Sequence, residues 1–103
     1  MARYTVRFAP RAERELGRLQ PSIRNRVTRA AAQLADDPRP RDSRVVAGWS
    51  ERTYRIRVGQ YRVLYEIHDD EVLVLVVRVA HRKDAYELRE HEEPYHLEAA
   101  AST

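Results

Sequence analysis

Residues 53–86, TYRIRVGQYRVLYEIHDDEVLVLVVRVAHRKDAY, decide the fold of this chain. Apolar and polar side chains alternate along three runs of this stretch, and a period of two predicts β-strands. The predicted strands are Thr53–Val58, Tyr61–Ile67 and Val72–Ala80. Gly59-Gln60 suits a two-residue hairpin turn with glycine first, and Asp69-Asp70 suits a second such turn. The stretch is therefore predicted to form an antiparallel three-strand meander.

The first predicted turn sets the register of the meander. If Val58 lies opposite Tyr61, then Arg57 lies opposite Arg62, and Arg55 shares their face. Like charges across a strand pair are destabilising, by an amount comparable with the ~0.2–1 kcal/mol of a favourable pair. Arginine forks bind phosphate oxygens two at a time and keep their charge at any working pH. This face is therefore predicted to hold an anion, the alternative being an ordinary solvated face of a hairpin.

The opposite face of the meander is apolar and needs a covering layer. Arg3–Phe8 alternates as a first strand, and prolines at positions 10 and 21 then suit the first turns of two helices. Each helix has an apolar stripe, formed by Ala12, Leu16 and Leu19 in the first and by Ile23, Val27, Ala31 and Leu34 in the second. The predicted fold class is α+β, with the order β-α-α-β-β-β. A helical hairpin packs on one face of a small sheet that contains the meander.

Composition indicates one small domain with a basic body. The chain has 103 residues, a net charge of +3 and no cysteine, which excludes disulfides and favours a reducing, cytoplasmic location without a membrane span. Residues 1–86 carry 18 Lys and Arg against 11 Asp and Glu, whereas residues 87–103 carry 1 against 5. Residues 1–86 are thus predicted to be the domain, and residues 87–103 an acidic C-terminal tail, partly helical or frayed. The basic body points to nucleic acid as partner.

Several familiar sites are missing from the sequence. There is no glycine-rich phosphate loop and no serine nucleophile elbow. His91 and His96 are five residues apart and separated by Pro94, which does not suit a helical zinc site. No metal and no cofactor is therefore predicted. Trp49, the only tryptophan, is expected to be a core residue, with an exposed stacking residue as the alternative.

The remaining candidates are the arginines together with His81 and Tyr86, at the end of the last strand. Such a set can cleave RNA without a metal, because the ribose 2′-hydroxyl of the substrate is itself the nucleophile. Arginine stabilises the charge that develops on the phosphate but is a poor base. Proton transfer then falls to His81, to Tyr86, or to water and the RNA. Arg78 falls on the apolar face and is predicted to be structural, paired with a carboxylate such as Glu66.

The segments YRIRVGQYRVLYEI and RVAHRKDAY, with the order of elements, closely resemble the RelE branch of the RelE/ParE superfamily of bacterial toxins. The likeness covers residues 3–86 and makes residues 1–86 a RelE-like toxin domain. It implies a toxin of a type II toxin–antitoxin system that enters the ribosomal A site and cuts messenger RNA there without a metal, leaving a 2′,3′-cyclic phosphate. It also implies a cognate antitoxin, and operator DNA bound through the toxin–antitoxin complex.

Site residues follow from the resemblance position by position. Arg62 and Arg82 match the phosphate-binding arginines of the family, and Tyr86 matches a tyrosine that stacks on or orients the substrate. Arg55 and Arg57 stand where the best-known member has lysines, which leaves the general base open and gives His81 more weight. Strict alternation puts Arg82 and His81 on opposite faces, so a bulge or turn after Ala80 is needed to bring both to the substrate.

Two other functions are compatible with the sequence. The ParE branch shares the fold but poisons DNA gyrase, and the retained Arg62, the His81-Arg82 pair and Tyr86 argue against it. A non-catalytic, basic nucleic-acid-binding module would bind phosphates with steep salt dependence and without cleavage.

Overall fold

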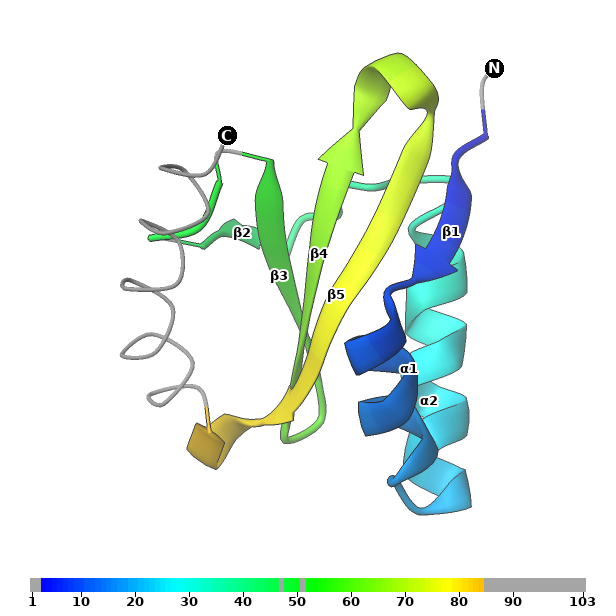
Figure 1. Cartoon of the computed structure of the whole chain (residues 1–103), viewed down its shortest axis with the longest axis vertical. Helices are drawn as coiled ribbons and strands as arrows, with labels where there is room; N and C mark the ends of the chain where they lie inside the picture. The colour runs from blue at the N-terminus through cyan, green and yellow to red at the C-terminus, as the bar shows by residue number, and fades with distance from the viewer. Residues whose placement is uncertain (1–2, 47, 51, 85–103) are drawn as a thin grey trace.

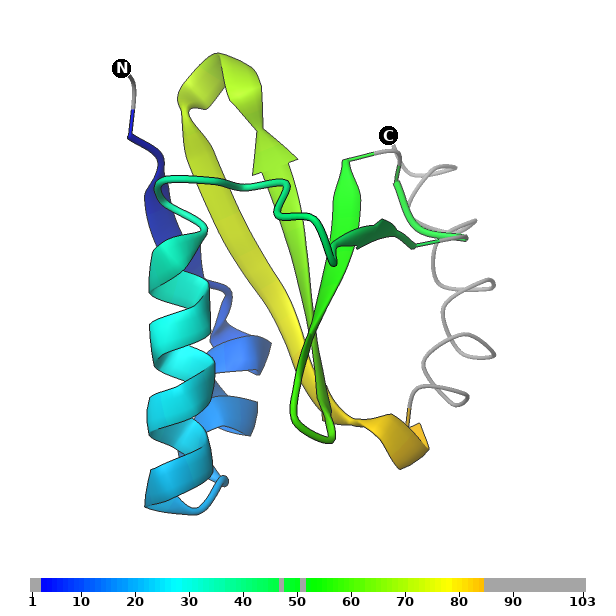
Figure 2. The ribbon, with the colours of Figure 1, turned by 180° about the vertical axis from the view of Figure 1, so that it is seen from behind.

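The computed structural model describes residues 3–46, 48–50 and 52–84. The helices and strands are β1 Thr5–Phe8, α1 Pro10–Gly17, α2 Pro21–Gln33, β2 Arg44–Val45, β3 Thr53–Val58, β4 Tyr61–His68 and β5 Leu73–His81. Both helices lie on one side of a twisted sheet (Figure 1), and the view from behind shows α2 along the same side (Figure 2). The predicted α+β class and helical hairpin are confirmed. The predicted tail, residues 87–103, and Tyr86 lie outside the described residues.

The sheet has five strands in the order β1-β5-β4-β3-β2. The register of the β3–β4 hairpin is as predicted, with Val58 opposite Tyr61 and Arg57 opposite Arg62. β1 lies parallel to β5, which makes β5 a central strand, as its apolar composition predicts. The short edge strand β2, in which Arg44 pairs with Arg55, was not among the predicted strands. Two residues are too few for a periodic signal.

The predicted two-residue turn at Asp69-Asp70 is wrong. The chain instead makes a 3₁₀ turn, η1, over Asp69–Glu71, and Val72 follows in the left-handed region with φ of 51°. This conformation costs a non-glycine residue roughly 1–2 kcal/mol, and a β-branched side chain is unusual there. Strand β5 consequently begins at Leu73, one residue later than predicted.

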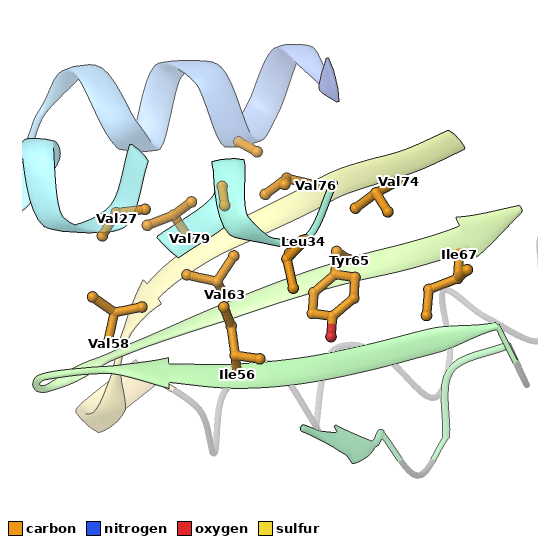
Figure 3. Packing of buried hydrophobic residues seen from close by; sticks show 12 residues of the cluster. Val27, Leu34, Ile56, Val58, Val63, Tyr65, Ile67, Val74, Val76 and Val79 are labelled. Atoms are coloured by element: carbon orange, nitrogen blue, oxygen red, sulfur yellow. The ribbon is translucent and has the colours of Figure 1, made fainter. Parts of the chain in front are cut away.

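The core lies between the helices and the sheet. Ala12, Val27, Ala31 and Leu34 come from the helical layer, and the sheet contributes the inward residues of β3, β4 and β5 (Figure 3). Tyr65 is fully buried at its centre, and its hydroxyl donates to the Pro38 carbonyl at 2.8 Å. Within the described residues, no helix is both long and apolar enough to cross a membrane.

A bulge in β5 changes the facing of its second half. Leu64 pairs with Arg78 and Tyr65 with Val76, so Val77 has no partner in the β4 ladder. Beyond the bulge, Val79 points into the core. The strict alternation assumed from the sequence therefore fails at Val77, and the residues that follow exchange faces.

Arg78 is structural and paired with a carboxylate, as predicted, but the carboxylate is that of Glu15 and not that of Glu66. Its guanidinium donates to Glu15 of α1, with Nη2 2.8 Å from Oε2, and the other oxygen of Glu15 accepts the backbone N–H of Val79 at 2.8 Å. Strand β1 ends at Phe8, so this part of the β5 edge has no neighbouring strand. Glu15 accepts the hydrogen bond that a neighbouring strand would otherwise accept from β5, and it so connects α1 to the sheet.

Candidate functional site

The outer face of the sheet, defined here as the face that points away from the helices, carries Arg55, Arg57 and Arg62. Arg57 and Arg62 are direct cross-strand partners, and Ala80 of β5 lies on the other side of Arg62. Arg55 is two residues from Arg57 on β3 and therefore shares its face. The alternation in the sequence predicted this shared face correctly.

Arg82 reaches this row because the chain turns at the end of β5. Strand β5 ends at His81, and residues Arg82–Asp84 form a 3₁₀ turn, η2. The backbone N–H of Arg82 donates to the carbonyl of Gln60 in the β3–β4 turn at 2.7 Å. This hydrogen bond holds the start of η2 at the tip of the β3–β4 hairpin, beside Arg57 and Arg62.

The guanidiniums of Arg57 and Arg82 lie close enough to that of Arg62 to influence its ionisation. Burial lowers the pKa of Arg62 from its ordinary value, and the positive charges of Arg57 and Arg82 lower that pKa further. We name Arg57, Arg62 and Arg82 the arginine cluster. With respect to residues 3–46, 48–50 and 52–84, none of the three guanidiniums has a hydrogen bond or ion pair.

Some arginines elsewhere in the fold bind carboxylates. Arg3, Arg39 and Arg78 each bind a carboxylate within 3.2 Å. The arginine cluster differs from these pairs because it brings three guanidiniums together without a carboxylate among the described residues. Neighbouring guanidiniums without a carboxylate partner suit an anion with several oxygens, above all a phosphate.

His81 lies apart from the arginine cluster. Its cross-strand partner is Tyr61, whose side chain packs on the core under the helices. The two rings meet edge to face, with centroids 5.2 Å apart, and Nδ1 of His81 accepts the backbone N–H of Lys83 at 3.1 Å. A bulge or turn after Ala80 was expected to bring both His81 and Arg82 to the substrate. The turn is present, but it brings Arg82 to the outer face and leaves His81 on the helix-covered face.

Trp49 lies on the outer face, next to the arginine cluster. It packs, partly buried, with Val46 and Val77 against Leu64 and Ala80, in a small apolar group separate from the main core. Ala80 is the cross-strand partner of Arg62. Trp49 therefore packs against a second, smaller apolar cluster and not in the main core, since the loop before β3 folds over the outer face. No local signal in the sequence indicates that path.

A hollow of about 510 Å³ lies near η1, away from the arginine cluster, and is lined by Arg39, Arg52, Tyr54, Ile67, Asp69 and Asp70. Its charges are compensated internally. Arg39 binds Asp69 at 2.8 Å, and the Tyr4 hydroxyl donates to the same carboxylate. The hydrogen bond from Arg39, followed by that from Tyr4, lowers the pKa of Asp69. This network connects β1, the loop after α2 and η1, and it is an architectural contact.

The described residues contain no group of three or more His, Cys, Asp or Glu side chains that could hold a metal ion. Tyr86, His91 and His96 lie outside those residues, so the structure describes neither the expected stacking tyrosine nor the histidine pair.

Comparison with known proteins gives a consistent relationship. Residues 6–86 match the family described as the ParE toxin of the type II toxin–antitoxin system parDE. Toxin RelG of Mycobacterium tuberculosis is 40% identical over 88 residues, which cover 81% of this chain and 95% of the relative.

Solved structures agree with the sequence relatives. The toxin–antitoxin complex RelBE2 of M. tuberculosis contains a chain that is 36% identical, with a TM-score of 0.68, covering 79% of this chain and 93% of that one. A mutant of Escherichia coli toxin RelE in the free state is 23% identical with a TM-score of 0.71, covering 92% of this chain and 97% of that one. The E. coli comparison supports the fold.

Proposed function

The chain belongs to the ParE toxin family, within the RelE/ParE superfamily, and we propose that this type II toxin is an endoribonuclease. In this proposal it cuts messenger RNA in the ribosomal A site and so blocks translation. The single observation that carries it is the arginine cluster, three neighbouring guanidiniums on an exposed face without a carboxylate among the described residues.

The reaction we propose is an internal transesterification. The ribose 2′-oxygen attacks the adjacent phosphorus, the bond to the 5′-oxygen breaks, and a 2′,3′-cyclic phosphate and a 5′-hydroxyl remain. The protein has to align the phosphate and stabilise the negative charge on its oxygens. Arg62 lies between Arg57 and Ala80 and has the central place for this role. Arg82 and Arg57 flank the same phosphate, and Arg55 contributes charge farther along β3.

Proton transfer needs a group other than arginine, which is too weak a base. Nδ1 of His81 already accepts the Lys83 N–H, and its ring packs on Tyr61. We therefore assign His81 to positioning the turn that carries Arg82, and not to the role of base, which the sequence left open between His81, Tyr86, water and the RNA. Tyr86 keeps the substrate-orienting role that the resemblance implies. The base is then Tyr86, water or the RNA itself.

A cognate antitoxin is the second part of the proposal. The 36% identical relative is one chain of a toxin–antitoxin complex. An acidic segment of such a partner could neutralise the arginine cluster and exclude RNA from it. The same complex is the form in which the toxin would reach operator DNA.

Gyrase poisoning is the competing function, because the matching family model is described by the name ParE. One experiment separates the possibilities. Purified protein is added to a translation reaction and, in parallel, to supercoiled DNA with gyrase. RNA fragments that end in a cyclic phosphate support the nuclease, and accumulated cleaved DNA with intact RNA supports the gyrase poison. Salt-sensitive RNA binding without either cleavage supports a binding module.

A further inference from the structure

Trp49 has a position that the proposed reaction does not yet use. Its indole rests on Leu64 and Ala80 of the outer face. Ala80 is directly across from Arg62, and Leu64 is two residues from Arg62 on the same face of β4. Two residues of a strand span about 7 Å. The residues under the indole are thus immediate neighbours of Arg62 in the sheet, one across the strand pair and one along β4.

The loop that carries Trp49 is fixed at both ends. Val46 N–H donates to the Thr53 carbonyl at 3.0 Å, and Thr53 N–H donates to the Ser50 carbonyl at 3.0 Å. Between them, Trp49 N–H donates to the Val46 carbonyl at 3.4 Å, and Gly48 has φ of 88°. A positive φ of this size lies in a backbone region that glycine adopts readily and other residues rarely do. The indole is thus presented from a constrained turn.

Packing alone does not account for an indole at this point. The buried members of the apolar group are only Leu64 and Ala80, and Trp49 lies partly buried at its rim. An aliphatic residue could cover both. Proteins bind single-stranded nucleic acid with positive charges for the backbone and aromatic rings for the bases. An indole beside the guanidiniums of the arginine cluster supplies both.

We propose that Trp49 is a base-stacking residue of this site, on which a nucleobase of the RNA rests while the arginine cluster holds its phosphate. This inference depends on the proposed function for its substrate. The phosphate is held by Arg62 and its neighbours, and the indole restricts the rotation of the attached nucleotide. Trp49 then binds the substrate and orients it, and takes no part in proton transfer.

The size of the effect can be bounded. Removing an aromatic stacking partner weakens binding of single-stranded nucleic acid by about 5- to 150-fold per base. Trp49→Leu keeps an apolar side chain over Leu64 and Ala80 but offers no ring, and it is expected to lose cleavage within this range. Trp49→Phe keeps a smaller ring and is expected to stay within about 5-fold of the unchanged protein.

Fluorescence gives a readout that a purely structural role would not move. Trp49 is the only tryptophan in the chain, so all indole emission reports on this site. The full-length protein is titrated with an eight-nucleotide 2′-O-methyl oligoadenylate, which lacks the 2′-hydroxyl needed for cleavage. A matched 2′-O-methyl eight-mer without bases serves as the control. Stacking predicts quenching that saturates with the first oligonucleotide and is absent with the second.

The outcomes separate this inference from the proposed function. Equal cleavage by the unchanged protein and by Trp49→Leu, with no base-dependent quenching, would overturn the inference and leave the nuclease proposal standing. If the unchanged protein does not cleave RNA at all, the nuclease proposal fails. The paired oligonucleotides then still decide whether Trp49 stacks on a base, since equal emission with both rejects stacking and base-dependent quenching supports it.

Discussion

Arg57 and Arg62 stand directly opposite each other on adjacent antiparallel strands of an exposed face. Direct opposition of like charges disfavours the hairpin by roughly 0.2–1 kcal/mol. At the β5 edge of the same sheet, by contrast, Glu15 neutralises Arg78. The hairpin therefore retains a small instability where the proposed function needs an anion site.

Arg62→Ala is expected to abolish most activity without weakening the fold. Removing one donor that stabilises a developing charge commonly lowers the rate by about 10²–10³. The melting temperature should stay the same or rise slightly, because the repulsion from Arg57 and Arg82 is removed. Translation inhibition and thermal unfolding are measured on the same preparation. Arg14→Ala, an exposed arginine of α1, is the matched control and should change neither. A variant of Arg62 that unfolds would contradict this prediction.

His81→Asn tests whether the imidazole is the base. Asparagine can place an acceptor near the position of Nδ1 and so keep the hydrogen bond from Lys83 N–H. We expect cleavage within about 10-fold of the unchanged protein, against about 10²–10³ for Arg82→Ala. The dependence of the rate on pH is recorded for both proteins. Loss of a titration step together with a fall above about 10² in His81→Asn would restore the histidine as base.

Glu15→Ala is expected to destabilise the fold strongly. The substitution leaves the partly buried guanidinium of Arg78 without its carboxylate and Val79 N–H without an acceptor. Breaking a buried pair costs about 3–5 kcal/mol, and this one should lie at the lower end because it retains some exposure. Urea unfolding measures the change. Arg11→Ala removes the exposed partner of the same carboxylate and should cost less than about 1 kcal/mol. Equal losses in the two variants would show that the Arg78 contact has no special weight.

Asp69→Asn is expected to remove part of the acid sensitivity of the protein. Hydrogen bonds from Arg39 and Tyr4 lower the pKa of Asp69 below its ordinary value of 3.8. A lowered folded-state pKa stabilises the protein above 3.8, and this contribution is lost as the pH falls through the folded-state value. The melting temperatures of the unchanged protein and of Asp69→Asn should differ at pH 7 and converge below pH 3.8. A difference that is constant from pH 7 to pH 3 would refute a contribution from this ionisation.

The parts of the fold that depend on neighbouring residues could be predicted from the sequence. Alternation and Gly59 define the β3–β4 register, and prolines at positions 10 and 21 mark the helix starts correctly. The parallel pairing of β1 with β5 and the edge strand β2 depend on contacts between distant segments. Arg78 illustrates the limit, because its partner Glu15 is 63 positions away and becomes necessary only where β1 ends.

The candidate site was predictable to a similar extent. Alternation placed Arg57 and Arg62 on one face, because both belong to a tightly turned hairpin. The bulge at Val77 and the turn after His81 decide the facing of His81 and Arg82, and neither has a distinctive residue pattern. Trp49 reaches the outer face through a loop whose path is determined by the strands it covers.

The most direct test of the nuclease is primer extension on a defined messenger in a translation reaction with purified protein. Parallel reactions contain Arg62→Ala, Arg14→Ala, and naked RNA with EDTA. An A-site nuclease should give cuts inside codons wherever ribosomes are present, with loss of the cuts in Arg62→Ala and their retention in Arg14→Ala. No cuts from a folded, antitoxin-free preparation, or cuts that persist undiminished in Arg62→Ala, would contradict the nuclease proposal.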